Sequence, residues 1–191
     1  MAILRIAVND REVVRAGGNR FCSLSWDIRA SVLENDLAAL DVSGLAEREP
    51  SIYDAAYWLE GFPLKPGDRV SIECRSDVEG ATPVRWHTHE ENEALRLEVA
   101  RAEAAGEYDG PRAVPRPRQR SRATLGLITP TGSRIAEAGK DGETVVCSGA
   151  WSDHHRTSEW LVRLTGYGAN ATKAPGEWLP IEGGVVVEIA A

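Results

Sequence analysis

A short pattern occurs twice in this chain. The sequence CSLSW at residues 22–26 is matched by CSGAW at residues 147–151, with cysteine, serine and tryptophan at the same spacing. An internal repeat of this kind predicts one supersecondary plan that is built twice. It constrains the fold more than any other feature, because both halves must then have the same order of elements.

The similarity continues on both sides of the motif. Three further segments match in the same order: residues 16–17 with 138–139, 40–45 with 162–167, and 70–73 with 185–188. The offset between matching residues falls from 125 at the cysteines to 115 at the last segment, so the second copy is shorter. Loops tolerate such deletions better than strands do, so we expect the missing residues to come from loops.

Most segments of both copies alternate between apolar and polar residues. In the first copy Cys22, Leu24 and Trp26 alternate with Ser23 and Ser25. A period of two is typical of half-buried strands and places the cysteine and tryptophan on the core side. We therefore predict a mainly β protein with two related small sandwich or barrel modules, at residues 1–78 and 122–191.

The connection at residues 79–110 breaks this period. Thr88 and Glu91 have the spacing of a capping box, in which each residue bonds the other's backbone N–H. Good helix formers follow as far as Gly106, which predicts a helix at about 88–106 that lies over one module or over the seam. Residues 111–121 are rich in proline and arginine and are expected to form an extended linker.

Composition indicates a soluble protein, with 42% hydrophobic and 27% charged residues. Two copies of roughly 70 residues are each near the lower size for a stable core, so we expect them to support each other. The chain has no apolar run of the roughly 18 residues that cross a bilayer and no signal-peptide pattern. Its three scattered cysteines do not indicate a disulfide framework. These features favour the cytoplasm.

The arginine cluster contrasts with a chain whose net charge is −7. Clustered arginines suit phosphates or an acidic protein, whereas prolines between them also suit a solvated tether. We favour the tether, and nucleic acid is an unlikely partner because the rest of the chain is acidic. If a partner protein binds here, the candidate residues are Arg112, Arg116, Arg118, Arg120 and Arg122.

Six tryptophans against two phenylalanines are a second unusual feature. Trp26 and Trp151 belong to the core by their strand phase. The other four are placed at strand ends or loops, where tryptophan either fills a small core or marks a recognition surface. The partner-binding candidates of this kind are Trp58, Trp86, Trp160 and Trp178.

Residues for catalysis are sparse. The four histidines form two pairs, and the weak metal-ligand candidates are His87, His89, His154 and His155. Imidazole suits zinc, but no third ligand has a familiar spacing. Cys22 and Cys147 share the apolar side of their strands and are expected to be core thiols. The sequence therefore predicts no catalytic residue, no metal and no cofactor.

The first copy resembles a set of small uncharacterised bacterial proteins. The similarity covers roughly residues 3–75 and rests on a hairpin near Asn9, an alanine-glycine pair, a strand ending in glycine and leucine, Trp58, and a leucine before Gly-Asp-x-Val. Asp10 and Ser43 stand where those proteins have glycine. The resemblance implies a β-module in a bacterial protein and brings no activity.

Two classes of function remain open. The first is a non-catalytic protein-interaction or accessory protein, such as an immunity, scaffold or defence-associated component, which binds another protein. The second is a metal-assisted hydrolase that uses the paired histidines. A nucleic-acid-associated role through the arginine-rich linker is a third alternative.

Overall fold

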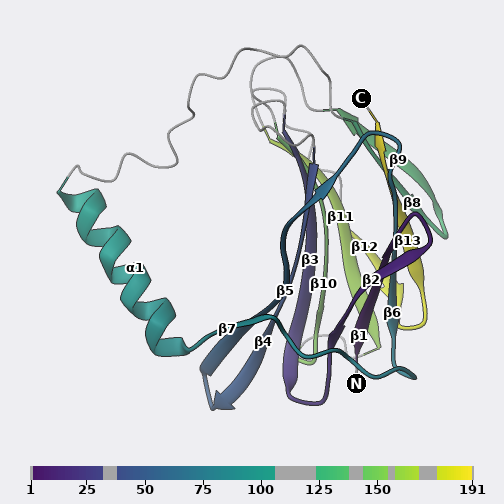
Figure 1. The fold of residues 1–191 in the computed structure, drawn as a ribbon. Helices are drawn as coiled ribbons and strands as arrows, with labels where there is room; N and C mark the ends of the chain where they lie inside the picture. The colour runs from purple at the N-terminus through teal and green to yellow at the C-terminus, as the bar shows by residue number, and fades with distance from the viewer. Residues whose placement is uncertain are drawn as a thin grey trace.

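The computed structural model describes residues 2–31, 38–105, 124–137, 144–154, 158–167 and 176–190. Two antiparallel sheets face each other in these residues, and a helix projects to one side (Figure 1). One sheet has six strands in the order β2-β1-β6-β13-β8-β9, and the other has seven in the order β12-β11-β10-β3-β4-β5-β7. The prediction of a mainly β protein is confirmed.

The first half supplies seven strands and the helix. Their bounds are β1 Ile3–Val8, β2 Arg11–Gly17, β3 Phe21–Ser31, β4 Ala38–Glu49, β5 Ile52–Leu64, β6 Arg69–Arg75, β7 Arg85–His87 and α1 His89–Ala104. The second half supplies β8 Thr124–Thr129, β9 Gly132–Glu137, β10 Thr144–Ser152, β11 Glu159–Tyr167, β12 Glu177–Pro180 and β13 Gly184–Ala190. No helix among the described residues has the length and apolar character needed to cross a membrane.

The halves meet in both sheets. Strand β3 pairs with β10, and β6 pairs with β13, in each case antiparallel. The structure does not separate the halves into two sandwiches, because apolar residues from both halves share one core between the sheets. Each half alone would have little apolar surface to bury, and pairing the central strands gives the two halves a larger common core.

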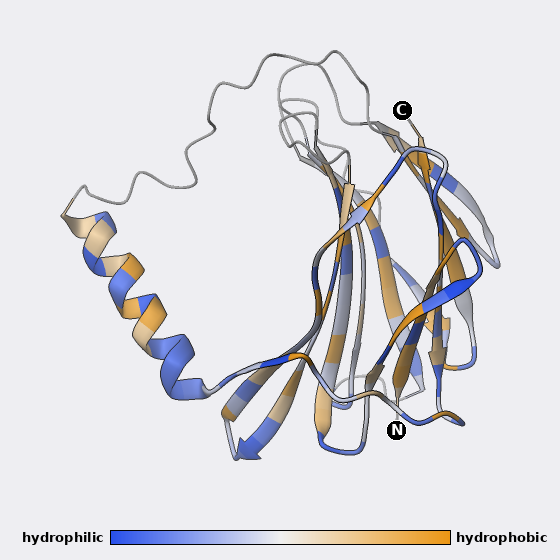
Figure 2. Ribbon diagram, viewed as in Figure 1, coloured by the Kyte–Doolittle hydropathy of each residue, from blue (hydrophilic) through white to orange (hydrophobic). Residues whose placement is uncertain are grey.

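Strand phase decides which side chains enter that core. Leu24, Trp26 and Ile28 of β3 are buried, as are Val145 and Cys147 of β10. Orange and blue segments alternate along the strands of both layers (Figure 2), as expected for strands with one face in the core. The sequence-based placement of Trp26 and Trp151 in the core is confirmed by exposures of 1% and 6%.

Each side edge of the sandwich is closed differently. In the first half, the segment between β6 and β7 crosses from one sheet to the other. The Trp58 indole N–H donates a hydrogen bond to the Ala81 carbonyl in this segment, at 2.8 Å. In the second half, the carboxylate of Glu177 on β12 accepts hydrogen bonds from Thr129 and Thr131 at the β8–β9 turn. These bonds tie the two sheets together beyond their shared apolar core.

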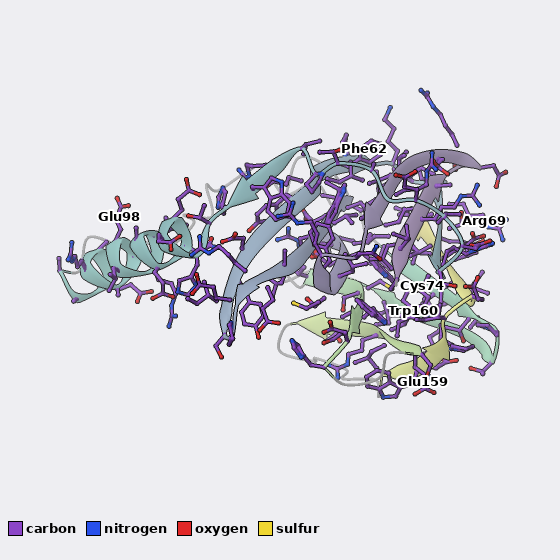
Figure 3. All side chains as sticks on the ribbon, turned by 90° about the horizontal axis from the view of Figure 1, so that it is seen from below. Phe62, Arg69, Cys74, Glu98, Glu159 and Trp160 are labelled. Atoms are coloured by element: carbon purple, nitrogen blue, oxygen red, sulfur yellow. The ribbon has the colours of Figure 1, made fainter. Side chains whose placement is uncertain are left out.

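Helix α1 lies apart from the sandwich. It begins beside the end of β7 and points away from both sheets (Figure 1), and none of its residues is buried. Figure 3 shows Glu98 on this helix, far from Trp160 in the sandwich. The expectation that the helix covers a module or the seam is wrong. Among the described residues only its first turn has partners on the sandwich, and its apolar stripes are too narrow to pack on a sheet.

Candidate partner-binding surface

The first turn of α1 is set by its own sequence. The backbone N–H of Glu91 donates to the Thr88 hydroxyl at 3.2 Å, and the Thr88 N–H donates to the Glu91 carboxylate at 2.8 Å. The capping box predicted from the sequence is therefore present. It satisfies two of the N–H groups that have no partner inside a helix, so the helix begins at a fixed residue.

The β4–β5 hairpin holds this first turn. The carboxylate of Asp54 accepts a hydrogen bond from the His89 backbone N–H at 3.0 Å. The Arg48 guanidinium binds both carboxylate oxygens of Glu90, one of them at 3.2 Å, and lies 3.7 Å from Asp54. Two side chains of the hairpin therefore fix the position and direction of the helix.

The charge of Glu90 depends on this contact. Its hydrogen bonds from Arg48, followed by a backbone hydrogen bond at the helix start, lower the pKa of Glu90 to about 2. A carboxylate in the first turn also interacts favourably with the positive end of the helix dipole. The anchor is therefore fully charged at neutral pH.

Beyond the first turn, the helix presents two narrow apolar stripes to solvent. Leu95 is 54% exposed and shares one stripe with Val99, while Leu97 is 55% exposed on the opposite side. Five glutamates and two arginines along His89–Ala104 give the helix a net charge of −3. A short helix without tertiary packing is marginally stable in water, so a partner that covers a leucine stripe would stabilise it.

Strand β7, at the edge of the seven-stranded sheet, lies beside the helix start. Trp86 is half-buried by Phe21, whose ring stacks on it with centroids 5.6 Å apart, and by Arg20, whose guanidinium carbon is 4.4 Å from the ring centroid. Val84, just before β7, is 76% exposed. This edge is adjacent to the helix in the chain, so we include it in the candidate surface.

The tryptophans predicted to bind a partner fall into two groups. Trp58 and Trp160 are 3% and 0% exposed, so they cannot meet a partner. Both side chains face the core. The burial of Trp160 could have been predicted from its alternation with Val162 and Leu164 along β11. Trp86 is half-buried, and Trp178 on β12 is 40% exposed.

The structure describes some of the predicted arginine and histidine candidates and does not describe the others. The arginines at 112, 116, 118, 120 and 122 and His155 lie outside the described residues. His87 packs edge-on against Tyr57, with ring centroids 5.4 Å apart, while His89 is the first residue of α1. His154 lies in the turn after β10, next to Asp153.

The fold and this surface define a two-sheet antiparallel β-sandwich with a projecting, charged helix. Comparison of the chain with protein-family models, with curated proteins and with solved structures gives no match.

Proposed function

We propose that this protein is a non-catalytic interaction protein that uses α1 to bind another protein. The sandwich acts as a rigid base, and the helix is the recognition element, held by Asp54 and Arg48 at its first turn. An accessory, scaffold or immunity role fits this design, because each requires binding without chemistry at the bound surface. The arginine cluster at 112–122 remains a predicted second contact.

The observation that carries this proposal is a helix of 16 residues with no buried residue and a well-formed start. Helices usually obtain their stability from packing of an apolar face. Here Leu95 and Leu97 remain exposed, although the capping box and two anchoring side chains specify where the helix begins. Such a helix is suited to insertion into a groove of a partner.

The charge of the helix indicates what kind of groove that would be. Glutamates outnumber arginines around the leucines, so the complementary surface is an apolar groove with basic residues on its rim. Charge complementarity of this kind speeds association and selects partners more than it raises affinity. We propose this partner in preference to a second copy of the chain, whose net charge of −7 would repel it.

We also propose that the sandwich arose from a duplicated unit. Outward from the centre, β6-β1-β2 corresponds to β13-β8-β9, and β3-β4-β5 corresponds to β10-β11-β12. The central register supports this proposal: Trp26 is paired with Gly149, and Trp151 is paired with Leu24. Since the repeat aligns Trp26 with Trp151 and Leu24 with Gly149, the two copies exchange equivalent partners, as a two-fold relation requires.

Site-specific photocrosslinking in cells of the source organism tests the proposal. A photoreactive amino acid replaces Leu95, and the matched control places it at Ile135, which is 73% exposed on β9. We expect one protein to be captured from position 95 and not from 135. Once purified, that protein should bind the wild-type chain and lose binding to a Leu95→Lys, Leu97→Lys variant.

Further outcomes distinguish a partner protein from a second copy of the chain and from nucleic acid. Binding of the captured protein should weaken as salt rises, because the rim contacts are exposed ion pairs. Crosslinks from position 95 only to another copy of this chain, or binding that the double lysine variant retains, would contradict the proposal. Salt-sensitive binding of duplex nucleic acid that requires residues 112–122 would favour the nucleic-acid alternative instead.

A further inference from the structure

The three cysteines of the chain have very different surroundings. All are free and buried. Burial raises the pKa of Cys74 to about 12 and also raises that of Cys147, which lies deep in the core. Cys22 instead lies at the start of β3, where Asp153 and His154 approach it from the turn after β10. In the part of the chain that the structure describes, this is the thiol that has an imidazole and a carboxylate beside it.

The backbone holds this turn against β3. Strands β3 and β10 are paired as far as Ser23 and Ser152. The Asp153 N–H then donates to the Cys22 carbonyl at 3.0 Å, and the His154 N–H donates to the Ser152 hydroxyl at 3.3 Å. The three side chains therefore meet because sheet pairing places the ends of these strands side by side.

The distances between the three side chains suit a shared metal ion. The Cys22 sulfur, a His154 nitrogen and an Asp153 oxygen all lie within 4.8 Å of one another. The His154 Nε2 atom is 3.6 Å from Asp153 Oδ1. Ligand atoms of a tetrahedral zinc ion, at about 2.0–2.3 Å from the metal, are separated by roughly 3–4 Å. Small rotations of the two exposed side chains would bring all three into that range.

The local charge also favours a cation. Asp153 and Glu47 both carry negative charge near Cys22 and, after desolvation by burial, contribute to the raised pKa of its thiol. The Cys22 thiol donates to the Leu45 carbonyl at 3.3 Å, and Tyr53 meets the His154 ring edge-on. Such surroundings oppose a free thiolate nucleophile, whereas a divalent cation would offset the negative charge.

We propose that Cys22, Asp153 and His154 form a binding site for a thiophilic divalent cation, with zinc as the best match. Thiolate, imidazole and carboxylate are all established zinc ligands. Binding replaces the thiol proton, which is released to solvent, and a neutral imidazole donates its lone pair. Three protein ligands leave the fourth tetrahedral position for water or for a group from a bound partner.

This site differs from the histidine-pair site considered from the sequence. The sequence predicts no metal site because no third ligand lies at a familiar spacing from either histidine pair. Its proposed co-ligand Cys22 lies in the other half of the chain, and only the pairing of β3 with β10 brings the two together. The site does not require the projecting helix, so it is independent of the proposed partner-binding function.

Cobalt(II) titration of metal-free full-length protein tests the site. Cobalt bound by a thiolate shows a sulfur-to-metal charge-transfer absorption, which reports Cys22 directly. We expect this absorption in the wild-type chain, its bleaching by added zinc, and its retention in Cys74→Ser and Cys147→Ala. Cys22→Ser should abolish it.

Because Cys22 is buried, Cys22→Ser could impair folding, so variants of the two exposed ligands provide a second test. Asp153→Asn and His154→Gln change half-exposed turn residues. We expect each to weaken cobalt binding by at least ~10–100-fold, the loss typical when a residue that hydrogen-bonds a metal ligand is replaced. Glu159→Gln, at the start of β11, is the matched control and should bind as the wild type does. Absence of the absorption in folded wild-type protein, or its persistence in Cys22→Ser, would overturn the proposal.

Discussion

The Trp26 indole lies directly over the backbone of Gly149. A Cβ atom on residue 149 would be 2.4 Å from Trp26 Nε1 and 2.9 Å from its Cζ2, and the two residues are paired across β3 and β10. The largest side chain at the centre of the sandwich is therefore accommodated by the one residue type without a side chain. The two halves of the chain depend on each other at this contact.

Gly149→Ala tests that contact. We expect the added methyl group to lower the free energy of unfolding by ~1–3 kcal/mol, because a tightly packed core must shift to accept it. Gly126→Ala is the control, since its Cβ would meet its nearest neighbour at an ordinary 3.7 Å. Urea unfolding measures both variants. Equal losses would show that strand propensity, and not Trp26, decides the result.

Truncation of Trp160 should lower the free energy of unfolding much more than truncation of Trp178. Trp160 is fully buried and packs against Trp26 with ring centroids 6.5 Å apart, whereas Trp178 is 40% exposed. We expect Trp160→Ala to cost ~3–5 kcal/mol in unfolding free energy and Trp178→Ala about 1 kcal/mol or less. A small loss for Trp160→Ala would contradict the burial of its ring.

Glu177 should contribute to stability through the bonds that join the sheets. Its half-buried carboxylate accepts hydrogen bonds from Thr129 and Thr131 and lies 3.5 Å from Arg134. We expect Glu177→Ala to cost ~1–3 kcal/mol, because Thr129 is buried and loses a partner. Glu188→Ala, which removes an exposed pair with Arg69, is the control and should cost under ~1 kcal/mol. Thermal unfolding of the two variants distinguishes these cases.

The anchoring of α1 should depend on pH through Glu90. Its pKa is lowered from 4.5 to about 2 by Arg48, so the charged form is favoured in the folded chain. Its contribution is therefore complete above about pH 4.5 and is lost as the pH falls toward 2. Far-ultraviolet circular dichroism should show helix loss in this window, and Glu90→Gln should reduce the change. Glu98→Gln, on the same helix away from Arg48, should not.

The sequence by itself determined the local structure. Alternation along residues 22–28 and 145–151 predicted strands and the side each residue faces, and Thr88 with Glu91 predicted where the helix begins. These features depend on residues a few positions apart, through strand geometry and backbone capping. For this reason they can be identified without knowledge of the fold.

Only the tertiary structure decided which strands pair and what meets at their ends. The pairing of β3 with β10 forms one sandwich from the two halves, and it brings Cys22 beside Asp153 and His154. Burial of Trp58 and exposure of the helix likewise follow from packing across the whole chain. Contacts between residues far apart in sequence depend on the total apolar surface that the chain can bury, and no local pattern specifies that choice.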